Sequence, residues 1–287
     1  MRIYPFVGTF MALTLALTVT QESVLGNTRE TSSPAKSLQT NNASLAHAIA
    51  SPNRSPQFKA RDAARHPAEE LEFFGIKRTM TVLEIAPGGG YWTEILAPYL
   101  KAHGTYYTTI GPPTNDRAIA AAAAWQAKLN ARKDEYGTVH VVEFGAGITD
   151  IIPPGTADLV VTFRNIHNWM AADYVDQAFA AFYRALKPGG ILGVEEHRGR
   201  TDQPQDPRAR SGYVREDYAI ALAEKAGFKL VAKSEMLANP RDTKDYPDGV
   251  WNLPPTLRLG SQDRAKYLAI GEADNFVLKF VKPAHDR

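Results

Sequence analysis

The sequence contains no cysteine, and this absence excludes several kinds of chemistry. A chain without thiols forms no disulfide bonds, offers no thiolate to a metal ion and has no cysteine nucleophile. Excess charge is missing too, because 33 lysines and arginines are balanced by 31 aspartates and glutamates. The basic residues are also scattered, so we expect no nucleic-acid partner, which would need them gathered on one surface.

Long hydrophobic runs are absent as well. The apolar stretch over 6–19 is too short to span a bilayer comfortably, and it follows a basic residue, Arg2. Small or modest residues at 24–26 lie at the usual spacing for cleavage. We interpret 1–26 as a signal peptide, with an uncleaved anchor as the alternative. The prediction is a periplasmic or secreted protein with no stable membrane association after cleavage.

The next segment, 27–55, is rich in Ser, Thr, Asn, Gln and Pro and has little periodic apolar surface. Such a composition does not offset the entropy lost on ordering, so we expect a disordered linker here. The remaining residues, 56–287, have ordinary apolar and charged fractions. They are numerous enough to bury a core of their own, and one domain is the simplest interpretation.

Apolar strands alternate with helices from residue 81 onward. Predicted strands cover 81–86, 105–110, 139–144, 157–163, 191–195, 229–235 and 275–282, and predicted helices cover 91–103, 118–132, 174–186 and 215–226. A helical segment over 58–74 is expected to break at Pro67. This alternation predicts an α/β fold with a doubly wound, mostly parallel, seven-stranded sheet.

A glycine-rich loop joins the first predicted strand to the helix that follows it, in the stretch Glu84-Ile85-Ala86-Pro87-Gly88-Gly89-Gly90. Glycine lets a ligand approach main-chain N–H groups closely, and the carboxyl ends of parallel strands are where such folds bind ligands. We therefore predict a ligand site here. Dinucleotides and S-adenosylmethionine both suit such a loop.

Two stretches together resemble class I S-adenosylmethionine-dependent methyltransferases. The stretch 82–93, which holds the glycine loop, is similar to their first motif, and 184–190, Arg-Ala-Leu-Lys-Pro-Gly-Gly, is similar to the turn before their fifth strand. The resemblance covers about 61–283 and is greatest to exported bacterial proteins known only as predicted methyltransferases. It implies a sheet whose last strand is antiparallel, and S-adenosylmethionine as the cofactor.

The same resemblance implies a set of cofactor-binding residues. Glu84 and the loop residues would face the methionine part of the cofactor, whose ammonium and sulfonium charges suit an acidic side chain. The expected contacts are Glu84, Ala86, Pro87, Gly88, Gly89, Gly90, Tyr91 and Asn165. Two departures from the family pattern stand out. Gly111 follows the second strand where an acidic residue usually holds the ribose, and Gly145-Ala146 follows the third where another often contacts adenine.

Polar residues gather after the fourth and fifth predicted strands, whose ends converge on the ligand crevice. His167 follows the fourth strand and is either a general base or a loop histidine that satisfies backbone groups. Glu196 and His197 follow the fifth, and either can reach a substrate. These three are our catalytic candidates. Their spacing matches no strong metal motif, so we expect no metal.

The functional hypothesis is methyl transfer from S-adenosylmethionine to a small molecule. An alternative is a non-catalytic protein that keeps the fold to bind or sense a small ligand. The two missing acidic contacts favour this alternative. So does the predicted export, because the cofactor is made in the cytosol.

Overall fold

The computed structural model describes residues 34–284, and the expected signal peptide lies outside this range. Its strands are β1 (Thr81–Ile85), β2 (Thr105–Ile110), β3 (Val139–Glu143), β4 (Ala157–Phe163), β5 (Leu186–His197), β6 (Lys229–Ser234) and β7 (Asn275–Val281). They form one sheet in the order β3-β2-β1-β4-β5-β7-β6. The first five strands run parallel and β7 runs antiparallel to both β5 and β6, which confirms the expected fold class.

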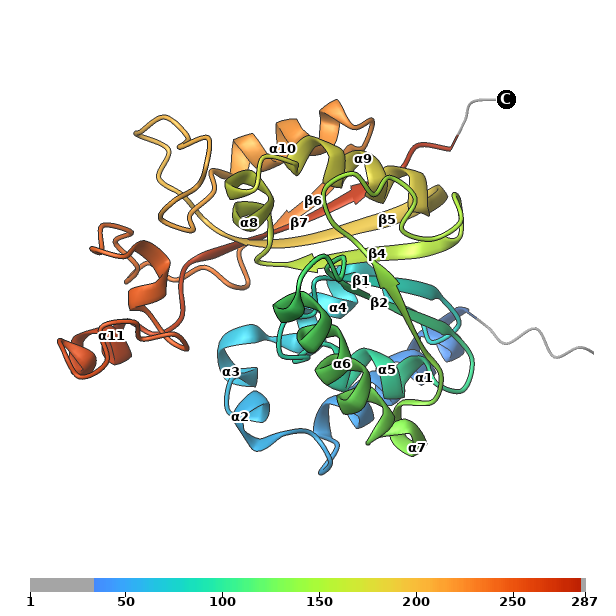
Figure 1. The fold of residues 1–287 in the computed structure, drawn as a ribbon. Coiled ribbons are helices and arrows are strands. Elements are labelled where there is room, and N and C mark those ends of the chain that lie inside the picture. Colours follow the sequence, from blue (N-terminus) through green and yellow to red (C-terminus); the bar gives the residue numbers. More distant parts are fainter. Residues whose placement is uncertain (1–33, 285–287) are drawn as a thin grey trace, which may run out of the picture.

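Helices cover both faces of this sheet (Figure 1). One face carries α8 (Ile166–Ala171), α9 (Val175–Ala185) and α10 (Glu216–Lys225). The other carries α1 (Pro34–Ala50), α4 (Pro67–Phe74), α5 (Thr93–Leu100) and α6 (Asp116–Asn130). Short helices α2 (Pro56–Lys59), α3 (Asp62–Arg65) and α7 (Lys133–Tyr136) complete this side.

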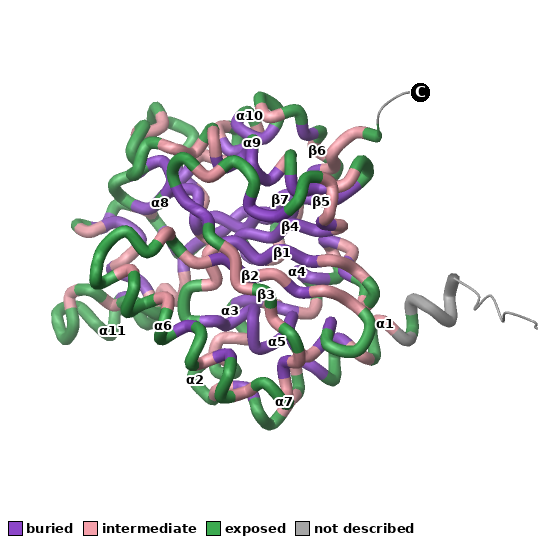
Figure 2. Tube along the Cα trace, turned by 45° about the vertical axis from the view of Figure 1, so that its right-hand side comes forward, coloured by how far each residue is buried: buried purple, intermediate pink, exposed green. Residues whose placement is uncertain are grey.

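Alternation along the strands divides the core between the two faces. Val82 packs with the α5 side while its neighbour Leu83 packs with the α9 side, as expected for side chains that point to opposite faces of a strand. Figure 2 shows the central strands as the most deeply buried part of the molecule. The site at their carboxyl ends is therefore built on a rigid base.

The expected break at Pro67 is confirmed. Helices α3 and α4 are separated by His66, whose φ of 41° is left-handed, and α4 starts at Pro67. Proline has no amide hydrogen and is tolerated in the first turn of a helix, so it starts a helix more readily than it continues one. The break turns α3 away from α4 and brings α3 over the carboxyl ends of the strands.

The expectation of a disordered linker over 27–55 is wrong for the described part of that segment. Helix α1 packs against α4 and α5, with Leu45 and Ala48 buried. Arg54 is also buried and pairs with Asp62 at 2.7 Å, while Ser55 donates to Glu94. The few apolar residues of α1 suffice because α4 and α5 supply the rest of the surface that they pack against.

A satellite cluster closes the site from the C-terminal side. Between β6 and β7 the chain forms a 3₁₀ turn, η1 (Gly249–Asn252), and helix α11 (Arg264–Ile270), which pack around Leu253 and Tyr267. In the range 34–284, no helix combines the length and apolar character needed to cross a membrane.

Candidate active site

The glycine loop after β1 has a backbone that suits glycine. Gly88 and Gly90 have φ values of 56° and 92°, and Ala86 has a φ of 51°. The amide of Ala86 donates to Thr109 Oγ1 at 2.8 Å, and the side-chain nitrogen of Asn165 lies 3.2 Å from the carbonyl oxygen of Ile85. Thr109 on β2 and Asn165, which precedes α8, thus hold the start of the loop in place.

Two cavities lie on either side of this loop. The first, which we call the apolar cavity, has a volume of about 630 Å³ and is walled by Ile110, Gly111 and the alanine face of α6. The second, the charged cavity, has a volume of about 280 Å³ and is walled by arginines, histidines and aromatic residues. Both are lined by Ala86, Pro87, Gly88, Gly89 and Asn165. One ligand can therefore lie across the loop and enter both.

Glu84 lies at the base of the charged cavity and is fully buried. Its Oε2 accepts hydrogen bonds from Tyr106 and from Thr93, the latter at 2.9 Å, whereas its Oε1 has no hydrogen-bond partner. Burial raises the pKa of Glu84 to about 7, although the two hydroxyl groups oppose that rise. A buried acceptor without a partner is costly, so this oxygen is suited to a donor that arrives with a ligand.

Tyr91 and Trp92 are both buried and both line the charged cavity. Trp92 stacks on Phe163 with ring centroids 4.1 Å apart, and the Tyr91 hydroxyl donates to Asp62 at 2.6 Å. These aromatic residues therefore both pack against the core and form a wall of the cavity. Gly90 lines neither cavity. A Cβ at this position would lie 3.0 Å from the side chain of Trp125, so the absence of a side chain lets Trp125 pack closely against the loop.

Ion pairs connect α3 and the residue before it to the end of β5 and to the segment before β7. Arg65 pairs with Glu195 at 2.8 Å, and Arg61 pairs with Glu272 at 2.6 Å. Arg164, which adopts a left-handed φ of 62°, reaches Glu272 at 3.1 Å. The sequence places these residues far apart, and only the folded chain shows that α3 covers the cavity.

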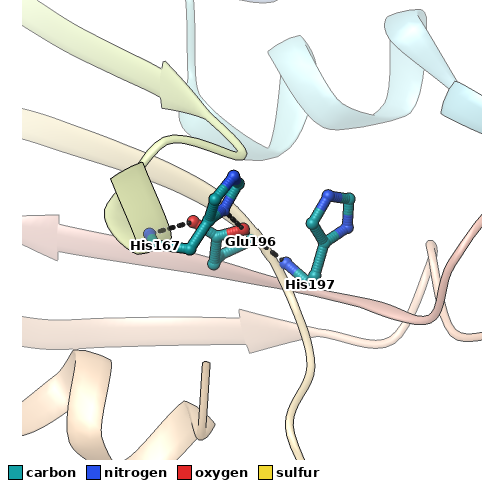
Figure 3. Close-up of side chains that lie close together, drawn as sticks. All are labelled: His167, Glu196 and His197. Atoms are coloured by element: carbon teal, nitrogen blue, oxygen red, sulfur yellow. Dashed lines mark hydrogen bonds and ion pairs between the residues drawn. The ribbon is translucent and has the colours of Figure 1, made fainter. Parts of the chain in front are cut away.

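The three catalytic candidates lie together at the ends of β4 and β5 (Figure 3). Nδ1 of His167 is 3.0 Å from Oε1 of Glu196, and the amide of His167 donates to the other carboxylate oxygen. The amide of His197 also donates to Glu196, at 2.8 Å. One ligand atom from each of the three lies within 4.8 Å of the others.

Glu196 differs from the other two candidates in one respect. His167 and His197 line the charged cavity, whereas Glu196 does not, because its oxygens are turned toward His167 and the His197 amide. Burial acts to raise its pKa, but pairing with His167 outweighs that and holds the pKa of Glu196 below its usual range. Glu196 therefore contacts His167 and the His197 amide and does not line the cavity, unlike the sequence-based expectation that it can reach a substrate.

Thr109 on β2 and Asn115 at the start of α6 are polar residues near the place of the missing ribose contact, but both already have partners within the protein. Thr109 Oγ1 accepts the hydrogen bond from the glycine loop, and Asn115 caps α6 by accepting from the amide of Ala118 at 3.0 Å. The lining of the apolar cavity also contains residues that the sequence pattern does not mark as functional. Ala121 and Ala122 belong to an alanine run that indicates only helix propensity in the sequence, yet both line the apolar cavity.

Comparison with known proteins decides between the ligand classes that suit a glycine loop. Residues 59–233, more than half of the chain, match a family model described as a methyltransferase domain. The chain belongs to this methyltransferase family. Its fold is that of the class I S-adenosylmethionine-dependent members, and no curated protein matches the sequence.

Solved structures with the same fold include a SAM-dependent methyltransferase from Aquifex aeolicus, at 18% identity and a TM-score of 0.51, which covers 84% of this chain and 98% of that one. Another is the [4+2]-cyclase SpnF, at 15% identity and a TM-score of 0.52, with 86% and 95% covered. At these identities the likeness shows the fold alone.

S-adenosylmethionine is the cofactor of this methyltransferase family. The residues present fit it on three counts. The unpartnered oxygen of Glu84 matches the ammonium of the methionine part, and Gly88 leaves open space where a side chain would intrude. The apolar cavity suits the adenosyl part because most of its wall is alanine, isoleucine, tryptophan and main chain, with Thr109, Lys128 and Asn165 as its polar side chains.

Proposed function

We propose that this protein transfers the methyl group of S-adenosylmethionine to a small-molecule acceptor, with His167 as the general base. The observation that carries the proposal is the 3.0 Å contact between His167 Nδ1 and Glu196, on the wall of the charged cavity. A carboxylate accepts from Nδ1 and so fixes the tautomer of the ring. The other ring nitrogen, Nε2, is then free to take a proton.

In this proposal the residues of the charged cavity accept the proton of the acceptor and limit its size. When bound, the cofactor supplies an electrophilic methyl group on a sulfonium sulfur, which keeps the bonding electrons and becomes a thioether. The acceptor forms a new bond to that carbon while its proton passes to His167 Nε2. Glu196 stabilises the imidazolium that results, and the volume of about 280 Å³ restricts the acceptor to a small molecule.

The direct test is turnover. Purified protein would be incubated with S-adenosylmethionine and a panel of small hydroxyl, amine and thiol compounds, and S-adenosylhomocysteine would be measured by mass spectrometry. We expect product above the acceptor-free control with at least one compound. Cofactor binding by calorimetry without any product across the panel would contradict methyl transfer.

A non-catalytic protein that binds or senses a small ligand is the second candidate. The specific observation that favours it is the lining of the apolar cavity, which contains no carboxylate, while Thr109 and Asn115 are engaged within the protein. Native mass spectrometry of protein from its own cells separates the two. Retained ligand together with failure in the turnover assay supports the second candidate, and turnover excludes it.

We also propose that the protein is exported. The support is the sequence over 1–26, with a basic start and a short apolar run. Fractionation of the producing cells, with the mass of the mature amino terminus, tests this. Full-length protein found only in the cytosol would contradict it.

A further inference from the structure

His197 has no part in the proton transfer proposed above, yet it is held as firmly as His167. Its Nδ1 lies 2.7 Å from Oδ1 of Asn275, on the antiparallel strand β7. An amide oxygen only accepts, so Nδ1 carries the hydrogen. In the neutral ring this leaves a lone pair on Nε2. Burial, assisted by Arg164 and opposed by Glu196, lowers the pKa of His197 to about 3, so the ring stays neutral at physiological pH.

His167 is held in the same way by a different partner. The carboxylate of Glu196 only accepts, so the hydrogen is on Nδ1 of His167 and the lone pair is on Nε2. The two rings are nearly parallel, with planes 27° apart and centroids separated by 5.5 Å, and they project side by side in Figure 3. The wall of the charged cavity thus presents two acceptor nitrogens next to each other.

The rest of the charged cavity limits what these nitrogens can bind. Trp251 lies edge-on to His167, with centroids 6.0 Å apart, and Val250, Pro254 and Pro255 extend this apolar wall. Arg164 lines the same cavity, and its charge acts on His197. This positive charge favours a group that becomes negative as it loses a proton, whereas the carboxylate of Glu196, which contacts His167 and the His197 amide, acts in the opposite sense.

We propose that His167 and His197 together bind two neighbouring hydroxyl groups of the methyl acceptor, which is a small planar compound with vicinal hydroxyls. This inference rests on the methyl-transfer function proposed above. A single hydroxyl satisfies one nitrogen, whereas two on adjacent carbons satisfy both, and a site built for two donors discriminates against a ligand that lacks one. The apolar wall packs against the flat face of the ring.

The two histidines have different roles in this arrangement. The hydroxyl on His167 gives its proton to Nε2 as its oxygen bonds to the methyl carbon. The second hydroxyl donates to His197 and keeps its proton, because a ring that stays neutral down to about pH 3 is a weak base. His197 is therefore a binding residue that determines specificity, and Asn275 positions it.

The experiment compares catechol with phenol, both as ligands of the protein saturated with S-adenosylhomocysteine and as acceptors. We expect catechol to bind at least tenfold more tightly than phenol in calorimetry, and to have a kcat/KM at least tenfold higher. Resorcinol, whose hydroxyls are not adjacent, should behave like phenol. Equal binding of catechol and phenol would overturn the proposal even if some other acceptor is methylated.

Variants of His197 provide a second test of the proposal. His197→Phe should lower the affinity for catechol at least tenfold and leave phenol unchanged within about twofold, whereas His197→Gln, which keeps an acceptor oxygen, should restore part of the preference. Unchanged cofactor affinity confirms that each variant is folded. If His197→Phe fails to fold, Asn275→Leu, which releases the ring, provides the same comparison.

Cobalt(II) absorption tests the competing occupant of the same nitrogens. Visible d–d bands that appear on adding cobalt and vanish in the His167→Ala and His197→Phe variants would overturn the proposal in favour of a metal site. Absence of such bands, together with the catechol preference, supports it. Failure of every acceptor to turn over, with catechol still preferred in binding, refutes methyl transfer and leaves the two-histidine site standing.

Discussion

The two cavities flanking the glycine loop differ in the charge of their walls, since Lys128 is, of the described residues, the one charged residue that lines the apolar cavity. The apolar cavity is walled by main chain, small side chains and one face of α6, whereas the charged cavity contains Arg61, Arg65, Arg164, His167 and His197. Shape and main-chain groups suffice to hold an adenosyl group. Moving a proton beside a sulfonium needs fixed charges, and those are gathered on the other side of the loop.

This difference predicts that changes at His167 and Glu196 alter turnover and leave cofactor affinity intact. His167→Ala should lower kcat roughly 10²- to 10⁴-fold because the acceptor loses its base. Calorimetry with S-adenosylhomocysteine should show affinity within about threefold of the unmodified protein. The effect on kcat should be smaller for Glu196→Gln. This change leaves an amide oxygen to hold the His167 ring in place but removes the negative charge that stabilises the imidazolium. Equal losses of kcat and cofactor affinity would refute the division of roles.

A change at the loop itself should disturb both cavities. Gly88→Val places a branched side chain in open space that both cavities share, at a φ of 56°. We expect cofactor affinity to fall about 100-fold, from steric exclusion rather than from backbone strain. Gly155→Val is the matched control, since its φ of 69° carries a similar strain and its surroundings are also open, but it lines neither cavity. Similar losses in both variants would mean that strain alone is responsible.

Glu84 gives a prediction that depends on pH. The folded protein holds a proton on this carboxyl up to about pH 7, against an ordinary value of 4.5. Ionisation of the buried carboxyl therefore adds no cost at low pH. Stability falls as the pH rises from 4.5 to about 7, and above that the cost is about 3 kcal/mol. Glu84→Gln should remove this cost, so that denaturant unfolding at pH 8 shows a more stable variant and at pH 4 shows little difference.

Cofactor binding should depend on the same carboxyl in the opposite sense. An ammonium group favours the ionised form, so affinity for S-adenosylhomocysteine should rise between pH 6 and 8, and binding near pH 7 should release a proton. In Glu84→Gln the affinity should be weaker at pH 8 and independent of pH. A pH dependence that persists in the variant would assign it to another group.

The smallest effect concerns the alanine face of α6. Ala121→Leu fills part of the apolar cavity and should weaken cofactor binding roughly tenfold, while kcat at saturating cofactor stays unchanged. Ala123→Leu, on the same helix but outside the cavity, should have no effect on binding. Both should alter the free energy of unfolding by less than about 0.5 kcal/mol. A lower kcat in Ala121→Leu would show that the cavities are not independent.

Much of the fold could be predicted from the local pattern of apolar and turn residues. The strands predicted at 81–86 and 157–163 end within one residue of β1 and β4, because buried parallel strands are short apolar runs bounded by turn residues. The prediction of disorder fails over the described residues 34–55 for the converse reason. Their composition is that of a disordered chain, but Leu45, Ala48 and Arg54 are ordered by partners on other elements.

The sequence by itself determined the order of strands and helices, the glycine loop and the polar residues that follow β4 and β5, since each depends on residues close together in the chain. Only the tertiary structure decided that Arg65 meets Glu195, that Asn275 orients His197 and that α6 walls a cavity. These contacts join residues from separate elements whose pairing no local periodicity encodes. They form only when the sheet brings its strand ends to one edge and the helices pack across it.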